Sequence, residues 1–324
     1  MIIGLCYDLQ NTYDISNNSV YKDFSFLSEV EYVERSLRKL GHKVVLINGL
    51  EKFVNNIQRY KSQCDLIFNM LEGYKSRNRE GLIPALCEAF DIAYTGTDAF
   101  GMSLSLNKYH MCQVVKSLNI KVANSYLIDY PTIDVDGLVQ SNIRYPCVIK
   151  PNREGSSMGV MLVYSQQELI EKAYNLSTLY DQQLIVEEYI PGTELSVGIL
   201  GTSTESRVYT CLEFVNEDGS NIELFDYHCK YNTEFKAITP RLKPGVLNCI
   251  CDYSLIIHKT IGFQDISRID WRVNNSVPYF IEATPLPAFD IGSDFDIGSK
   301  MVGENFESVL NKVLLSALKR KKGK

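Results

Sequence analysis

The first hundred residues alternate between short apolar runs and stretches whose apolar positions recur at helical spacing. Apolar runs at 2–7, 43–47 and 65–70 predict buried strands. The stretches 29–40 and 82–90 place their apolar residues on one face of a helix. Strands that alternate with helices in this way predict an α/β lobe with a parallel, doubly wound sheet.

Beyond residue 104 the pattern changes to strands with alternating apolar and polar positions, which is typical of antiparallel sheets. The predicted strands are 125–128, 146–150, 160–164, 184–189, 195–200, 207–215, 267–273 and 279–283. Helical spacing predicts helices at 107–118 and near 167–176. We therefore divide the chain into an N-terminal lobe (1–104), a central lobe (105–184) and a C-terminal lobe (185–324).

Length, charge and cysteine content limit the classes of protein. A chain of 324 residues exceeds what one hydrophobic core usually organises, which agrees with two or three lobes. The net charge of -6 argues against a general affinity for nucleic acid, since binding to phosphate backbones needs clustered cations. Nine cysteines without a short-spaced framework favour a reducing compartment, and we expect a cytoplasmic protein. No segment approaches the ~20 apolar residues that span a bilayer, so no membrane partner is expected.

Separate segments carry the residue types that a nucleoside triphosphate site requires. The loop 155–159 reads Gly-Ser-Ser-Met-Gly, and such small residues allow a backbone to approach phosphates closely. It is followed by 186–189 with two glutamates, by 226–231 with a lysine, and by two predicted strands that carry Asp270 and Glu282. Lysines would neutralise phosphates, and separated carboxylates would hold magnesium.

Two other interpretations of the loop 155–159 stay open. Its sequence matches G-x-S-x-G, the nucleophile elbow of serine hydrolases, with His228 or His258 as base. That elbow must lead into a helix, whereas residues 160–164 are strand-like and favour a flap that joins two strands. A purely structural glycine turn is the second alternative.

Taken together, these segments resemble the ATP-grasp ligases, and within them the D-alanine–D-alanine ligases and their relatives, from about residue 65 to about residue 293. The resemblance implies a Rossmann-like N-terminal lobe followed by a two-lobe α+β ATP-grasp fold, with the nucleotide between antiparallel sheets. It also implies ATP and one or two magnesium ions, with manganese as a substitute. The implied partners are small-molecule carboxylate and amine substrates, preferably amino acids, and a homodimer is implied by the resemblance alone.

The resemblance assigns nucleotide-binding roles to a set of residues. The counterpart of Lys108 reaches the α- and β-phosphates, that of Lys150 lies between adenine and phosphate, and that of Lys230 touches the transferring phosphoryl group. An isolated lysine is usually a surface charge, so these roles depend on the surrounding motifs. The full set is Lys108, Lys150, Glu154, Gly155, Ser156, Ser157, Glu187, Glu188, Tyr189, Ile190, Glu194 and Lys230.

The adenosine end of this set is also implied by the resemblance. Glu187 would accept from the adenine amino group, and the backbone at Glu188 and Ile190 would contact the edge of the ring. Glu194 would hold the ribose hydroxyls. The alternative is that the two adjacent glutamates are exposed acids on an edge strand.

A short turn at 274–276 joins the strands that carry Asp270 and Glu282, so a hairpin would bring both carboxylates onto one face. Carboxylate oxygens are hard ligands that suit magnesium. Thr284 stands where the related ligases have an asparagine, and its hydroxyl is a poorer third ligand. Arg268 lies on the same face as Asp270, where it either stabilises an acyl phosphate, as the resemblance implies, or forms a structural pair with Asp270.

The resemblance implies that a substrate carboxylate attacks the γ-phosphate of ATP and that an amine then displaces phosphate from the acyl phosphate. The implied catalytic residues are Arg268, Ser156, Tyr231 and Lys230. Ser156 and Tyr231 would belong to a flap that excludes water. Ala288 replaces a glycine of the related ligases beside the developing oxyanion, and Ser293 matches a serine that contacts the carboxylate of the second substrate.

The first-substrate region departs furthest from the related ligases. The glycine-rich N-terminal turn with its ammonium-binding glutamate is replaced by residues 7–11, and the histidine of a Leu-His-Gly turn is replaced by Glu72. A carboxylate there repels the carboxylate of a substrate, so we expect that D-alanine is not the favoured first substrate. Glu72 would bind an ammonium group, and Arg77 or Arg79 would meet an acid.

Three functions follow from these observations. The first is a carboxylate–amine ligase that forms an amide or peptide bond. The second, motivated by Thr284 and Ala288, is an ATP-binding homologue with weak or lost ligase activity and a regulatory role. The third is an acyl-phosphate enzyme that uses a nucleophile other than an amine.

Overall fold

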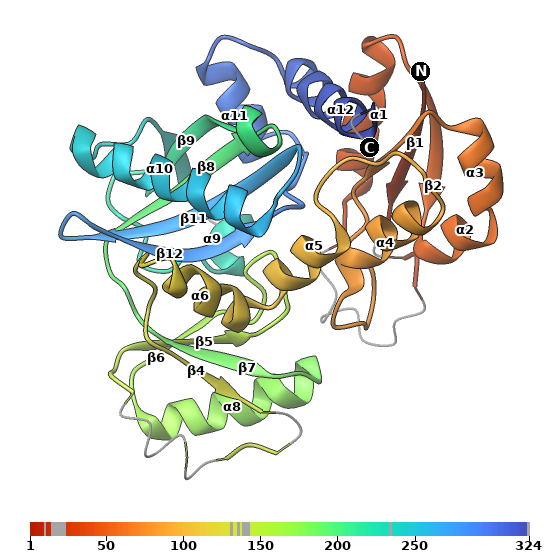
Figure 1. Ribbon diagram of the computed structural model, residues 1–324. Helices are drawn as coiled ribbons and strands as arrows, with labels where there is room; N and C mark the ends of the chain where they lie inside the picture. Colours follow the sequence, from red (N-terminus) through yellow and green to blue (C-terminus); the bar gives the residue numbers. More distant parts are fainter. Residues whose placement is uncertain are drawn as a thin grey trace.

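Three sheets organise the chain in the computed structural model, which describes residues 1–9, 11–13, 24–129, 132–134, 137, 143–232 and 235–322 (Figure 1). Their strand orders are β2-β1-β3, β4-β7-β5-β6 and β10-β9-β8-β11-β12. In Figure 1 the three-stranded sheet lies beside the five-stranded sheet, and the four-stranded sheet lies below the five-stranded one. The predicted α/β class, with a parallel first lobe and antiparallel later sheets, is confirmed.

The first sheet is parallel, as the alternation of strands and helices predicts. β1 (Ile2–Tyr7) lies between β2 (Lys43–Asn48) and β3 (Leu66–Asn69) and pairs in parallel with both. All four residues of β3 are buried, which is typical of parallel strands covered on both faces. The helices that follow these strands are α1 (Leu27–Lys39), α2 (Leu50–Asn55), α3 (Ile57–Gln63), the 3₁₀ helix η1 (Arg79–Gly81), α4 (Leu82–Ala89) and α5 (Ala99–Leu106).

The central sheet is antiparallel and packs against a long helix. Its strands are β4 (Ser125–Ile128), β5 (Cys147–Pro151), β6 (Met161–Val163) and β7 (Leu184–Glu188), preceded by α6 (Lys108–Ser117). The long helix α8 (Gln166–Tyr180) buries Leu169, Ala173 and Leu176 in the core that it shares with this sheet. It begins after Ser165, whose hydroxyl accepts from the amide of Glu168 and so caps the helix.

One face of the five-stranded sheet shares a hydrophobic core with the longest helix of the C-terminal lobe. The elements of this lobe are β8 (Thr193–Leu200), the 3₁₀ helix η2 (Ser203–Glu205), β9 (Arg207–Asn216), α9 (Tyr227–Asn232), β10 (Phe235–Ile238), α10 (Pro244–Ile261), β11 (Ile266–Asn274), β12 (Val277–Thr284), α11 (Asp294–Met301) and α12 (Phe306–Lys322). On β11, Trp271 is fully buried and its indole N–H donates to the Ser254 hydroxyl of α10 at 2.9 Å. Because side chains alternate along a strand, Arg268, Asp270 and Arg272 lie on the opposite face of β11.

Helix α12 joins the C-terminal lobe to the first lobe. Its apolar side chains share one core with β1, β3 and α1, and Figure 1 shows α12 beside α1. Arg320 of α12 pairs with the buried Asp265 at 2.7 Å and donates to the carbonyls of Tyr94 and Gly96. The ion pair lies within the C-terminal lobe, and the hydrogen bonds from Arg320 to the two first-lobe carbonyls help to fix the lobes relative to each other.

We propose two small shifts in the predicted lobe boundaries. The boundary between 184 and 185 would place β7 in the C-terminal lobe, but β7 pairs with β4 and β5 of the central sheet. The central lobe therefore ends after Glu188. The boundary between 104 and 105 falls within α5, and Asn107, between α5 and α6, is the more natural division.

All nine cysteines are free thiols, so packed cores rather than disulfide bonds stabilise the fold. Within the described residues, no helix combines the length and the apolar character that crossing a bilayer requires.

Candidate active site

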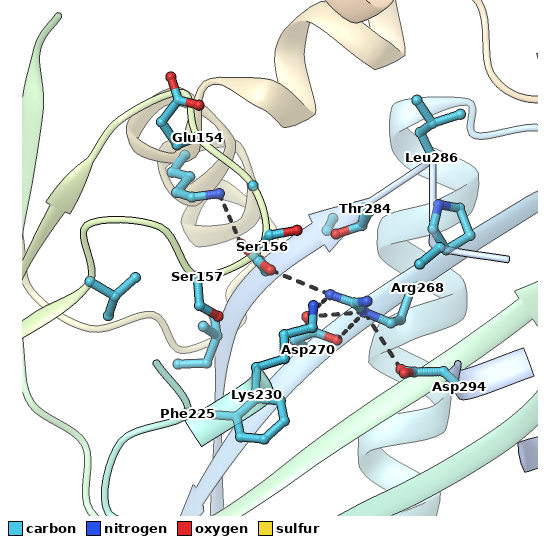
Figure 2. Close-up of a pocket in the computed structure, with 18 of the residues that line it drawn as sticks. Glu154, Ser156, Ser157, Phe225, Lys230, Arg268, Asp270, Thr284, Leu286 and Asp294 are labelled. Carbon is cyan, nitrogen blue, oxygen red and sulfur yellow. Dashed lines mark hydrogen bonds and ion pairs between the residues drawn. The ribbon is translucent and has the colours of Figure 1, made fainter. Parts of the chain in front are cut away.

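A cavity of about 450 Å³ lies between the three lobes, and most of the predicted site residues line it (Figure 2). Those residues are Lys108, Lys150, Glu154, Gly155, Ser156, Ser157, Glu187, Glu188, Tyr189, Ile190, Glu194, Lys230, Arg268, Asp270, Glu282, Thr284, Glu72, Ala288 and Ser293. Arg77 is exposed and Arg79 is buried, and neither belongs to the wall of this cavity. Tyr231 lies in α9, but its side chain falls outside the described part of the structure.

The loop between β5 and β6 has a backbone that few residue types tolerate. Ser156, Ser157 and Gly159 have φ values of 48°, 57° and 67°, in the left-handed region. A Cβ atom at Gly159 would lie 2.8 Å from the ring of Pro151, so the loop requires glycine there. Figure 2 shows Ser156 and Ser157 on this loop near Arg268, where both line the cavity.

The serine-hydrolase interpretation of this loop is wrong, because a strand, β6, follows it instead of a helix. His258 is fully buried, and its ring nitrogens contact the Ser267 hydroxyl at 2.7 Å and the Gly201 carbonyl at 3.2 Å. Burial lowers the pKa of His258 to about 4. His228 does not line the cavity either, so neither histidine is placed as a base for Ser157.

Two lysines of the predicted nucleotide site are paired with carboxylates of the cavity wall. Lys150 on β5 forms an ion pair with Glu187 on β7 at 2.5 Å, and both side chains are less than a tenth exposed. Lys108, the first residue of α6, pairs with Glu282 on β12 at 2.9 Å. Burial opposes the charge on Lys150, but Glu187 outweighs it and raises the pKa of the lysine. Lys150 therefore stays cationic, as neutralisation of phosphate requires.

The connection between β7 and β8 forms one end of the cavity. Glu188 accepts from the side-chain amide of Asn124 at 3.0 Å, and the Tyr189 hydroxyl donates to the carbonyl of Glu223 at 2.8 Å. Glu187 is only 7% exposed, and its strand β7 lies between β4 and β5. The alternative of two exposed acids on an edge strand is therefore wrong for Glu187.

The β11–β12 hairpin places two carboxylates directly opposite each other, as predicted. Asp270 pairs in register with Glu282, and both line the cavity. The turn residues Asn275 and Ser276 have φ values of 49° and 65°, the geometry of a two-residue type I′ hairpin turn. Among the residues that the structure describes, no group of three or more His, Cys, Asp or Glu side chains is arranged to hold a metal ion. The hairpin thus offers two carboxylates rather than a closed cage.

Arg268 binds the carboxylates around it (Figure 2). Its Nε and Nη2 atoms donate to Asp270 at 2.8 and 2.7 Å, while Nη2 lies 3.5 Å from Glu282 and Nε lies 3.6 Å from Asp294. Burial opposes the charge on Arg268, but Asp270, Asp294 and Glu282 together raise its pKa. The structural pair with Asp270 is therefore present, and Arg268 also reaches two further carboxylates of the wall.

The same cluster shifts the pKa values of its two hairpin carboxyls in opposite directions. Burial raises the pKa of Asp270, and the charge of Glu282 adds to this effect against the attraction of Arg268. For Glu282, burial is outweighed by Lys108 and Arg268, which hold its pKa below the usual range. Glu282 is thus the more firmly ionised of the two.

A fully buried carboxylate organises the first-lobe side of the cavity. Asp8, directly after β1, accepts from the amides of Glu72 and Gly73 at 3.2 and 2.9 Å and from the Tyr13 hydroxyl at 3.1 Å. Burial raises the pKa of Asp8 to about 6, although these donors oppose the shift. Asp8 thereby fixes the backbone that carries Glu72, which lines the cavity. Gln10, in the same N-terminal segment, lies outside the described residues.

Arg79 connects the first lobe to the loop between β5 and β6. Its Nη1 atom donates to the carbonyl of Arg153 at 2.7 Å, and its Nη2 atom lies 3.7 Å from Glu154. Glu154 also accepts from the amide of Gln182 at 2.6 Å, and Figure 2 shows it apart from the cluster around Arg268. The sequence led us to expect that Arg77 or Arg79 meets an acidic group of a substrate. In the structure, Arg79 contacts groups of the protein itself.

The segment after β12 forms a further part of the cavity wall. Ala288 is an exposed residue of its wall. Ser293, at the N-terminus of α11, is 7% exposed, and its buried hydroxyl has no hydrogen-bond partner among the described residues. Because an unpaired buried polar group costs about 1–3 kcal/mol, a ligand that bonds to Ser293 would offset this cost.

Five further charged residues of the wall have no role in the sequence-based assignment, namely Glu29, Glu80, Arg272, Asp290 and Asp294. Arg268, Asp270 and Arg272 alternate along β11, so the sequence alone predicts that Arg272 shares a face with the other two. Asp294 begins α11 and Glu29 lies in α1. No spacing relates those two acids to the hairpin, and only the fold brings them to the cavity.

Comparison with known proteins identifies the family. The family model described as D-ala D-ala ligase C-terminus matches residues 116–315, which is more than half of the chain. A D-alanine–D-alanine ligase from Thermotoga petrophila is 30% identical over 89% of this chain and 90% of its own length. The corresponding protein from Carboxydothermus hydrogenoformans is 29% identical over 88% of this chain and 90% of its own length.

Solved structures agree in fold. A D-alanine–D-alanine ligase from Bacillus anthracis complexed with ATP has a TM-score of 0.75 at 19% identity and covers 100% of this chain and 99% of that one. The VanG D-Ala:D-Ser ligase from Enterococcus faecalis has a TM-score of 0.75 at 23% identity, over 98% and 99% of the two chains. These likenesses show the fold, and the sequence matches show the family. The chain therefore belongs to the D-alanine–D-alanine ligase family of ATP-grasp enzymes.

Proposed function

We propose that this protein is an ATP-dependent ligase that joins a carboxylate to an amine through an acyl phosphate. The observation that carries the proposal is the position of Arg268, which donates to Asp270 and lies within 3.6 Å of Glu282 and Asp294 in one cavity. A fixed planar cation among carboxylates suits a metal-bound phosphate on one side and a developing oxyanion on the other. The unpartnered hydroxyl of Ser293 in the same wall supports a ligand there.

The space between the central and C-terminal sheets suits a nucleoside triphosphate. Lys108, Lys150 and Lys230 line one cavity, and their charges match a triphosphate tail that carries ~4 negative charges. The small residues at 155–157 allow backbone amides to approach phosphates. A solved structure of the same fold is complexed with ATP, which supports this nucleotide as the phosphate donor.

Magnesium fits the β11–β12 hairpin. This ion is usually held by one or two carboxylates together with substrate phosphates and water, so a cage of three acidic side chains is not required. Asp270 and Glu282 would hold it, with the Thr284 hydroxyl as a weaker oxygen ligand. When bound, the ion would neutralise charge on the transferring phosphoryl group.

The chemistry consists of two displacements. A carboxylate oxygen of the first substrate attacks the γ-phosphorus, and the bond to the ADP oxygen breaks with its electron pair on ADP. The amine nitrogen then attacks the acyl carbon, phosphate leaves with the electron pair of its bond, and the nitrogen loses a proton. Arg268 would stabilise the charge that develops on the acyl oxygen, while Ser156 and Tyr231 would help to exclude water.

The first substrate is proposed to differ from D-alanine. Glu72 lines the first-lobe side of the cavity, where its carboxylate repels another carboxylate and attracts an ammonium group. Replacing this charge by imidazole should therefore favour D-alanine. We expect Glu72→His to raise kcat/KM for D-alanine about tenfold, measured by ADP release, because removing one close repulsion changes binding by about 1.4 kcal/mol. An unchanged kcat/KM would contradict the role of Glu72.

The ligase proposal is tested by ADP release with ATP, magnesium and paired D- and L-amino acids, followed by mass measurement of any condensation product. The expected result is release that requires both a carboxylate and an amine, and that is lost in Asp270→Asn. If no pair of substrates supports release above the rate of this variant, the ligase proposal fails. Rapid formation of D-alanyl-D-alanine, at ~1 to 10³ per second, would contradict only the altered first-substrate pocket.

A second candidate is an ATP-binding member of the family with weak or lost ligation and a regulatory role. Thr284 and Ala288 favour it, since they stand where the resemblance implies a stronger metal ligand and a glycine. ATP binding in calorimetry without ADP release for any substrate pair would support this candidate over the ligase.

A further inference from the structure

Arg272 is a buried cation of the cavity wall to which the proposed reaction gives no role. It lies on β11 in register with Glu194 on β8, and 5% of its surface is exposed. The alternation of β11 places it on the same face as Arg268 and Asp270, and all of these residues line one cavity. A buried cation without a fixed partner is costly, so the contacts of Arg272 indicate what it does.

The guanidinium of Arg272 donates to three separate segments. Its Nε atom donates to a carboxylate oxygen of Glu194. Its Nη1 atom donates to the carbonyls of Ile190 at 3.2 Å and Glu223 at 2.8 Å, and Nη2 donates to the carbonyl of Ile222 at 3.0 Å. A planar guanidinium holds several acceptors in fixed directions, which a lysine ammonium does not. Arg272 thus fixes the β7–β8 connection, β8 and the segment before α9 relative to one another.

Glu194 accepts from Arg272 with one oxygen only. The bond goes to Oε2, and the structure shows no hydrogen bond from another described residue to Oε1. The Glu194 side chain is 12% exposed and lines the cavity. Because an ionised carboxylate has about four acceptor sites, Oε1 has the capacity for two hydroxyl donors from a ligand. A vicinal diol has that arrangement of donors.

The carbonyls that Arg272 holds precede the helix that carries a phosphate-binding lysine. Leu224 and Phe225 follow Glu223 directly and line the cavity, and α9 begins two residues later with Tyr227. Lys230 is part of α9 and lines the same cavity. The position of Arg272 therefore influences both the carboxylate at one end of the nucleotide and the lysine at the other.

We propose that Arg272 is a positioning residue for the ribose of the nucleotide. It orients Glu194 so that the open carboxylate oxygen accepts from the 2′- and 3′-hydroxyls, and it fixes the segment that leads to Lys230. The inference rests on the proposed use of ATP. It gives the site a selectivity for ribonucleotides over deoxyribonucleotides, which the proposed function alone does not require.

The test compares kcat/KM for ATP and for 2′-deoxy-ATP in the wild type, Arg272→Met and Arg272→Lys. We expect the wild type to prefer ATP at least tenfold, because a site built to bond a hydroxyl rejects the analogue that lacks it. In Arg272→Met the preference should fall to within about threefold, while KM for ATP rises about tenfold and KM for the amine substrate stays unchanged. Arg272→Lys keeps the positive charge but lacks the planar guanidinium. Its preference for ATP should therefore lie between those of the wild type and Arg272→Met.

Arg241→Met is the matched control, since Arg241 donates to Glu213 of the same sheet but neither residue lines the cavity. This variant should keep the wild-type preference. If circular dichroism shows that Arg272→Met is unfolded, kcat/KM for ATP and for 2′-deoxy-ATP is compared in Glu194→Gln instead. The preference for ATP should fall at least fivefold in that variant as well.

Two results would overturn the inference and leave the ligase proposal standing. One is a wild type that uses ATP and 2′-deoxy-ATP equally, and the other is a folded Arg272→Met that keeps the wild-type preference. Failure of the wild type to bind or use any adenine nucleotide would instead overturn the proposed function, and this inference with it.

Discussion

The two ends of the cavity hold their carboxylates in different ways. Between the central and C-terminal sheets, Glu187 faces the side-chain cation Lys150 at 2.5 Å. On the first-lobe side, Asp8 accepts from two backbone amides and Glu29 accepts from the amide of Phe289 at 2.7 Å. A side-chain ion pair is able to exchange partners when a charged ligand arrives, whereas a carboxylate bonded to amides is part of the backbone fold. The proposed nucleotide end thus allows replacement of partners, and the proposed substrate end has a fixed shape.

The largest effect should come from Arg268, which contacts carboxylates of the hairpin and of α11. We expect Arg268→Met to lower kcat about 10³-fold, because removing one donor to a developing oxyanion commonly costs that much. The measurement is ADP release at saturating substrates on protein that is folded by circular dichroism. Arg241→Met, outside the cavity, should stay within about twofold of the wild type. A rate for Arg268→Met within tenfold of the wild type would remove Arg268 from the catalytic role.

The second prediction concerns the stability that the ion pair of Lys150 and Glu187 contributes. Lys150→Met leaves Glu187 buried and unpaired, so the free energy of unfolding should fall by about 3–5 kcal/mol in urea denaturation. The double variant Lys150→Met, Glu187→Leu removes both charges and should regain most of this loss. Arg38→Met breaks an exposed pair with Glu34 and should cost less than about 1 kcal/mol. Equal losses in the single and double variants would contradict the pairing argument.

The smallest expected effect is on the pH dependence of stability. It arises from Asp8, which accepts from backbone amides on the first-lobe side of the cavity. The pKa of Asp8 is about 6 in the folded protein, above the value of about 3.9 expected for an unfolded chain. The folded state therefore binds the proton more tightly, and the stability that this adds at low pH is lost as pH rises towards 6. Relative to Asp8→Asn, the wild-type free energy of unfolding should fall by roughly 2–3 kcal/mol between pH 4 and pH 7. A constant difference would show that the three donors fully offset the effect of burial on the pKa of Asp8.

Local patterns predicted those parts of the fold that depend on neighbours in the sequence. The strand 2–7 has the predicted bounds, and the helix near 167–176 is the core of α8. The facing positions of Asp270 and Glu282 followed from the hairpin, because a short turn fixes the register of the two strands that it joins. Helix α5 has no clear polar face, so its sequence carried no periodic stripe to reveal it.

The candidate site was harder to predict where burial and long-range packing decide the direction of a side chain. The sequence analysis expected Arg77 or Arg79 to meet a substrate acid, but Arg79 is buried, and its guanidinium lies against the Arg153 carbonyl and Glu154. Glu29 and Asp294 come from helices of opposite ends of the chain. Their meeting in one cavity follows from the packing of whole lobes, which no local spacing encodes.

The packing of α12 into the core of the first lobe has a consequence for synthesis of the chain on the ribosome. Strands β1 and β3 emerge first, yet part of the apolar surface that they bury is supplied by α12, more than two hundred residues later. A nascent chain that has emerged only as far as α11 still exposes that surface to chaperones and proteases. We therefore expect the first lobe to mature late, after the C-terminal helix has left the exit tunnel.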